Sequence, residues 1–94
     1  MPISNTMAKA INAQVGREFG AHFQYLEIAS HFHDDGLPQM GAFFDQQAAE
    51  EHEHAMRFLQ YVRDSGAKVA IPAIPAPKAA YKSSKEAVAL ALKW

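Results

Sequence analysis

The chain has 94 residues, of which 49% are hydrophobic and 20% charged, and its formal net charge is −1. That length allows one domain at most, and the nearly neutral charge offers no basic field that would attract nucleic acid. The absence of cysteine excludes disulfides, thiolate zinc sites and cysteine nucleophiles. The longest apolar run, residues 87–92, is far shorter than the roughly 20 residues that a membrane span needs. We therefore expect a cytoplasmic protein, a single domain over residues 1–94, with neither nucleic acid nor membrane as a partner.

Two long helices are predicted at the start of the chain. The first covers about residues 5–34, because short polar side chains that can cap it come first and Gly36 can end it. The second covers about residues 38–65, because Pro38 suits a first helical turn and Gly66 follows. The connection between them is only a few residues long. We therefore expect an all-α fold that begins with an antiparallel helix hairpin.

The segment after the second helix is expected to be extended over residues 66–83, because its prolines prevent a regular helix. Such a crossover is long enough to run along a helix. Ser83 can then cap a short third helix over residues 84–94, and the sequence stops after about two turns. The last helix is thus expected to end in mid-course.

The second helix carries a Glu51-x-x-His54 pair in phase with an apolar stripe. Residues spaced by three and four share one helix face, so the stripe is predicted to be buried. Burying an ionised glutamate there costs on the order of several kcal/mol of folding free energy unless a positive charge lies beside it. No Lys or Arg lies on the stripe to supply that charge. The stripe comprises Met40, Phe44, Gln47, Glu51, His54, Phe58 and Tyr61.

The first helix supplies a second acid in the same way. Ile11, Glu18, Tyr25 and Phe32 recur every seven residues, so Glu18 lies on a largely apolar face. Inward glutamates together with a Glu-x-x-His pair are the means by which helix bundles hold di-iron or di-manganese ions. We expect Glu18 and Glu51 to face each other, with a raised pKa for the pair. Carboxylates and imidazole suit iron, which is the predicted metal.

As a set, these motifs resemble the first half of a bacterial non-haem ferritin. The resemblance rests on Glu18 with Tyr25, the Glu50-Glu51-x-x-His54 segment, the Leu37-Pro38 helix start, Val69-Ala-Ile-Pro72 and Glu86-Ala-Val-Ala-Leu-Ala-Leu92. It covers nearly all of this chain but only about half of the family's usual length. It implies a ferritin-like four-helix bundle with a long crossover, homo-oligomeric cages, oxidation of Fe(II) at a dinuclear centre and storage of ferric mineral.

The resemblance also implies residue roles. Glu18 and His54 would bind the first iron, Glu51 would bridge two irons, and Tyr25 would lie close to that centre. Glu50 would be a further iron ligand or simply an exposed acid. The family's third and fourth helices supply the remaining carboxylates, and the third-helix ligand is expected just after Trp94. These residues would therefore form half of a ferroxidase site, whether the chain is a truncation, a split subunit or a half that dimerises.

Other histidines are not expected to be iron ligands. His52 lies about 100° around the helix from Glu51, and a haem bound there is not expected. His22 is predicted to pack within the protein or at an interface. His31 and His33 lie near the end of the first helix, where a cation interacts favourably with the helix dipole. The alternative function is a metal-free helical assembly module, a half-ferritin without catalysis. In either case we expect the uncovered apolar stripe to make the chain associate.

Overall fold

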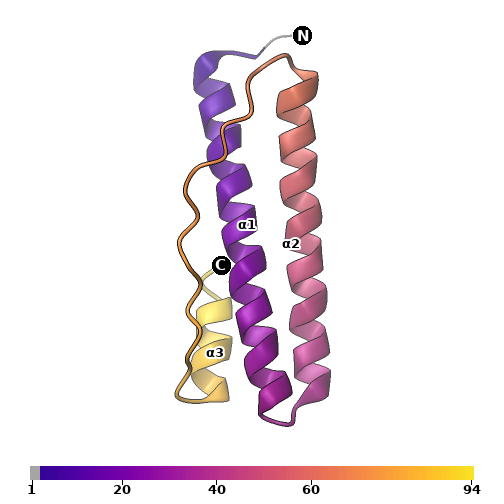
Figure 1. The fold of residues 1–94 in the computed structure, drawn as a ribbon, viewed down its shortest axis with the longest axis vertical. Helices are drawn as coiled ribbons and strands as arrows, with labels where there is room; N and C mark the ends of the chain where they lie inside the picture. Colours follow the sequence, from indigo (N-terminus) through magenta and orange to yellow (C-terminus); the bar gives the residue numbers. More distant parts are fainter. Residues whose placement is uncertain (1–2) are drawn as a thin grey trace.

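A computed structural model of the chain describes residues 3–94 and contains three helices, α1 (Asn5–Asp34), α2 (Pro38–Asp64) and α3 (Ser84–Ala91). Figure 1 shows α1 and α2 side by side and antiparallel, with α3 beside one end of α1. No strand occurs in the described part of the chain. The predicted all-α helix hairpin is therefore confirmed. None of the helices within residues 3–94 is both long and apolar enough to cross a membrane.

The helix ends follow from short polar residues and glycine. The Ser4 hydroxyl accepts a hydrogen bond from the Met7 amide at 3.1 Å, which caps α1. Gly36 and Gly66 have φ of +74° and +78°, a left-handed conformation that follows the ends of α1 and α2. The Ser83 hydroxyl likewise accepts from the amide of Glu86 at 3.2 Å and caps α3.

The face of α2 that packs on α1 differs in part from the predicted stripe. Small residues such as Ala48 and Ala55 are fully buried there, because they let the two helices approach closely. The bulkier Met40, Phe58 and Tyr61 are exposed, so the prediction that the whole stripe is buried is wrong. These partly exposed side chains mark the side of the hairpin that is called the open side below. The buried residues of α2 are Gly41, Phe44, Ala48, Ala55, Leu59 and Val62.

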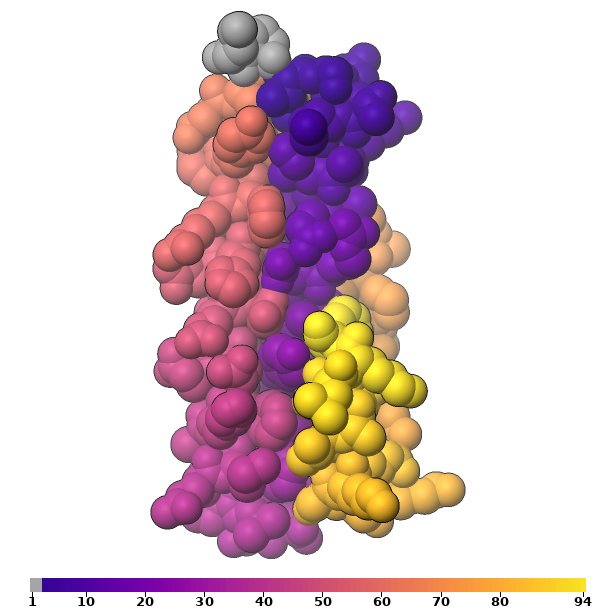
Figure 2. Space-filling model, turned by 180° about the vertical axis from the view of Figure 1, so that it is seen from behind, coloured from indigo at the N-terminus to yellow at the C-terminus, as the bar shows by residue number. Residues whose placement is uncertain are grey.

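The crossover between α2 and α3 runs along α1, on the side away from α2 (Figures 1 and 2). Its proline-rich backbone fits a groove made by two buried glycines of α1. A Cβ on Gly16 would overlap the ring of Pro72, and one on Gly20 would lie 3.1 Å from the indole of Trp94. Gly16 thus leaves room for the crossover, and Gly20 for Trp94.

Two buried amide side chains of α1 fasten the crossover by its backbone. Asn12 donates to the carbonyl of Lys68 and accepts from the amide of Ala70, both at 3.1 Å. Gln24 in turn donates to the Lys78 carbonyl and accepts from the Lys78 amide, both at 3.0 Å. These bonds satisfy polar groups that would otherwise be buried without partners.

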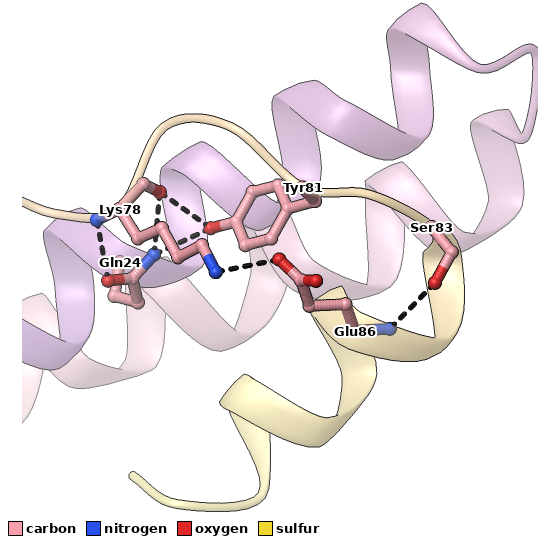
Figure 3. Close-up of polar contacts among 5 residues, drawn as sticks. All are labelled: Gln24, Lys78, Tyr81, Ser83 and Glu86. Atoms are coloured by element: carbon pink, nitrogen blue, oxygen red, sulfur yellow. Dashed lines mark hydrogen bonds and ion pairs between the residues drawn. The ribbon is translucent and has the colours of Figure 1, made fainter.

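A polar cluster joins α1, the crossover and the start of α3 (Figure 3). The Gln24 amide also donates to the Tyr81 hydroxyl at 2.6 Å, and that hydroxyl donates to the Lys78 carbonyl at 2.7 Å. The Lys78 ammonium forms an ion pair with Glu86 at 2.6 Å. The helix α3 ends at Ala91, whereas the sequence predicted it to continue to residue 94. The residues after Ala91 turn, so that the indole of Trp94 packs on Gly20 of α1.

Candidate metal site

Glu18, Glu51 and His54 come together on the open side of the hairpin. Each offers one ligand atom, and these atoms all lie within 4.8 Å of one another. His54 Nδ1 lies 3.9 Å from Glu18 Oε2 and 3.8 Å from Glu51 Oε2. The exposed fractions of the three side chains are 15%, 21% and 47%. The two carboxylates are thus largely withdrawn from water, while the imidazole stands at the mouth of the site.

A hydrogen-bonded chain along α1 orients Glu18. The Gln14 amide donates to Glu18 Oε1 at 2.9 Å, and the guanidinium of Arg17 donates to Gln14 Oε1 at 2.9 and 2.6 Å. The remaining oxygen of Glu18 is the one that lies toward His54. Both carboxylates also border a hollow of about 300 Å³, lined by Gln14, Arg17, Glu18, Ala21, Glu51, Lys93 and Trp94.

Burial is the largest cause that raises the pKa of Glu51, to about 7. A hydrogen bond with Glu18 and the negative charges of Glu18 and Glu50 raise the pKa further. Glu51 therefore carries a proton on a large share of molecules near neutral pH. Burial and the neighbouring acids thus make the charged form of Glu51 less favourable than at an exposed position.

Tyr25, which the resemblance to ferritins implies near the metal centre, lies within reach of the charges of both acids. Burial raises the pKa of the Tyr25 phenol, and the charges of Glu51 and Glu18 raise it further. Its ring also packs 6.1 Å from that of Phe44, between centroids. Glu50 is exposed and does not belong to the three-residue group, although its charge reaches Glu51.

Three of the other histidines contact neighbouring groups of the hairpin or the crossover. His22 Nδ1 lies 2.7 Å from the carbonyl of Ala48, so His22 is a packing residue between the helices, as expected. His33 pairs with Asp45 at 2.9 Å, and the ring of His31 packs against Phe32 and Tyr81, while its Nε2 is buried without a hydrogen-bond partner in residues 3–94. Both His31 and His33 lie in the last turn of α1, as their expected interaction with the helix dipole requires.

Sequence reasoning missed the groups that surround Glu18, Glu51 and His54. Gln14 lies four residues before Glu18, and this i,i+4 spacing is the signal that could have indicated their hydrogen bond. The contact of Trp94 with Gly20 brings the end of the chain to the same hollow. No local pattern indicated this contact, because it depends on the path of the crossover.

Comparison with known proteins places the chain among ferritins. It is 39% identical over 79 residues to ferritin BfrB of Mycobacterium tuberculosis, which is 84% of this chain and 44% of the relative. Ferritin BfrB of Mycolicibacterium smegmatis is 40% identical over 82 residues, 87% of this chain and 45% of the relative. A bacterial non-heme ferritin of Staphylococcus haemolyticus is 32% identical over 84 residues, covering 89% and 51%.

The chain therefore spans about half the length of the curated relatives it matches. A family model described as a ferritin-like domain matches residues 8–93, which includes both long helices, the crossover and α3. The relationship supports iron storage at the level of the family, in agreement with the resemblance seen in the sequence. With the fold, the match and the relatives in agreement, the chain belongs to the ferritin family.

Proposed function

We propose that this chain binds iron through Glu18, Glu51 and His54, as part of a ferritin-type iron store. The observation that carries the proposal is the convergence of two largely buried carboxylates and an imidazole from two helices, with ligand atoms within 4.8 Å. Carboxylate oxygen and imidazole nitrogen are suitable donors for Fe(II) and Fe(III), and no sulfur ligand is present.

The electrostatics favour a cation at this place. Burial and mutual repulsion make the paired carboxylates costly when both are charged, and a proton on Glu51 relieves that cost in the free protein. A divalent ion would displace this proton and supply the missing positive charge. Gln14 holds one oxygen of Glu18, which leaves the other oriented toward His54 for the metal.

We further propose that Fe(II) is oxidised at the site once additional ligands complete it. Three protein ligands suit one iron at modest affinity, whereas a dinuclear centre needs carboxylates from beyond residues 3–94. These would come from another segment or from a second copy of the chain. Each Fe(II) would then lose one electron to dioxygen or peroxide, and the ferric product would pass to a mineral store.

The oxidation proposal is tested by adding Fe(II) aerobically to the protein and following the rise in ferric absorbance. We expect the wild type to exceed the background rate and Glu51→Ala to return to it. Glu53→Ala is the matched control, because Glu53 is an exposed acid on the same helix, paired with Arg57. Equal rates for wild type, Glu51→Ala and buffer would contradict ferroxidase activity in this chain.

A second proposed function is helical assembly, which the open face of the hairpin favours. Met40, Phe43 and Leu92 are exposed large apolar residues there, and they border a groove of about 470 Å³. Contiguous apolar surface of this kind usually marks an interface. We expect sedimentation at micromolar concentration to show an associated species, which Phe43→Ser with Leu92→Ser shifts toward the monomer. A folded wild-type species near the chain mass of 10.4 kDa would contradict assembly.

A further inference from the structure

A pair of histidines, one on each long helix, lies close to the carboxylate group but outside it. The rings of His22 on α1 and His52 on α2 have centroids 5.3 Å apart and planes inclined by 59°. Helical geometry places Glu51 and His52 about 100° apart around α2, on either side of the buried Ala48 and Ala55. His52 therefore lies on a different face of α2 from Glu51, while His22 lies one helical turn beyond Glu18 on α1, and neither belongs to the three-residue group.

A hydrogen bond fixes the tautomer of the His22 ring that can bind a metal through Nε2. Its Nδ1 lies 2.7 Å from the carbonyl oxygen of Ala48, an acceptor, so Nδ1 carries the proton and donates it. The lone pair of the neutral ring is then on Nε2. Metal-binding histidines are commonly fixed in this tautomer by a backbone carbonyl on the other ring nitrogen. Ala48 lies one helical turn before His52, so the same bond sets the position of His22 relative to His52.

The separation of the rings fits a shared ion. Two imidazoles on one tetrahedral metal, with metal–nitrogen distances of about 2.0 Å, place their ring centres about 5 Å apart. The observed separation is 5.3 Å. The ring of Phe23 packs on His22 and that of Phe19 on His52, with centroids at 5.3 and 5.9 Å, which limits the motion of both imidazoles.

We infer that His22 and His52 form a second metal site, selective for borderline divalent cations such as Zn²⁺, Ni²⁺ and Cu²⁺. Two neutral nitrogen donors without a carboxylate suit these ions and not hard ions such as Mn²⁺. Water or a group from another chain would complete the coordination. The affinity of two protein ligands is modest, and the site ties α1 to α2 across a face that also carries exposed Phe23.

The test uses zinc alone, and Mn²⁺ as the contrasting ion, with calorimetry on the wild type and on three variants. We expect wild-type protein to bind one more Zn²⁺ than Glu18→Gln/Glu51→Gln does. His52→Gln should remove the zinc site that persists in that double variant, or weaken it at least about tenfold. Mn²⁺ should bind the wild type and not the double variant. His33→Gln is the matched control, because His33 is an exposed histidine paired with Asp45, and it should leave zinc binding unchanged.

Ring resonances give a second readout that does not depend on the carboxylate variants. In the wild-type protein, saturating Zn²⁺ should shift the imidazole signals of both His22 and His52. The inference is overturned if His52→Gln binds as much zinc as wild type, if no zinc binds once Glu18 and Glu51 are replaced, or if His33→Gln removes the site. None of these outcomes bears on iron binding, which uses Glu18, Glu51 and His54.

Discussion

The two sides of α1 differ in how completely their groups are packed and paired. On the crossover side, Gly16 packs on Pro72, and the buried amides of Asn12 and Gln24 bond to backbone groups of the crossover. An ion pair between Lys78 of the crossover and Glu86 of α3 joins these two segments. On the side shared with α2, two largely buried carboxylates lie beside exposed aromatic side chains. The closed side, along the crossover, has the paired polar groups of a protein interior, whereas the open side leaves apolar area exposed. The contacts that fasten the crossover thus lie on one side of α1, and the proposed iron ligands on the other.

The largest effect on stability is expected on the closed side, from Gly16→Ala. The added Cβ would overlap the Pro72 ring, and the extended crossover could only yield by shifting its backbone. Overpacking of this kind typically costs about 1–3 kcal/mol of unfolding free energy. Urea unfolding followed by circular dichroism measures the change.

Gly41→Ala is the matched control for that substitution. The nearest atoms to a Cβ on Gly41 belong to the His33 ring, an exposed side chain that can swing away. Because alanine is about 1 kcal/mol better than glycine inside a helix, Gly41→Ala should be neutral or stabilising. If the two variants lost equal stability, the closed side would not be the tightly packed side of the hairpin.

A smaller effect, with the opposite sign, is expected at Glu51 on the open side. The pKa of Glu51 is raised from 4.5 to about 7 in the folded protein, so its favourable contribution is present at low pH and lost as pH rises through about 7. Glutamine does not ionise, so Glu51→Gln does not lose this contribution to stability as pH rises. At pH 8 we expect the variant to be about 1–2 kcal/mol more stable than wild type, below the full shift because the side chain keeps contact with water.

Denaturant unfolding at pH 5 and at pH 8 checks the prediction for Glu51. At pH 5 the difference between variant and wild type should be much smaller than at pH 8, because pH 5 lies only just above the ordinary pKa of 4.5 and well below the folded value of about 7. A variant less stable than wild type at pH 8 would show that the charged carboxylate stabilises the metal-free protein.

The smallest effect is expected at the start of α3. Ser83→Ala removes the hydroxyl that accepts from the Glu86 amide, which typically costs about 1 kcal/mol or less in a helix that is already short. Faster amide exchange confined to residues 84–91 measures the loss. Ser84→Ala is the control, since within residues 3–94 the Ser84 hydroxyl makes only a long contact, to Asp35 at 3.4 Å.

The hairpin was predictable because the residues that begin and end its helices act locally. Glycine after each long helix, proline at the start of α2 and serine caps set the element ends. The spacing of Glu51 and His54 on one face of α2, and of Glu18 on a comparable face of α1, agrees with the way the three side chains come together. Their role as iron ligands stays a prediction. The resemblance to ferritins then agreed with the family found by comparison.

What sequence reasoning could not supply is which side of α2 packs on α1. Hydrophobicity favours Met40, Phe58 and Tyr61 as core residues, yet close helix contact selects the small Ala48 and Ala55. The pH range of the site also needed the structure. Burial and the bond to Glu18 raise the pKa of Glu51 to about 7, so a proton would compete with a metal at a higher pH than at an ordinary carboxylate.

The central claim is that the open side binds iron through its two carboxylates and His54, and thermal unfolding with Fe(II) under anaerobic conditions tests it most directly. At a hundred times the dissociation constant, binding adds about 2.7 kcal/mol, which raises the midpoint of a domain of this size by on the order of 10 °C. We predict this rise at pH 8, a smaller one at pH 6, and none in Glu18→Gln/Glu51→Gln, which should be at least as stable without metal. An undiminished rise in that double variant would contradict the account and place the iron elsewhere.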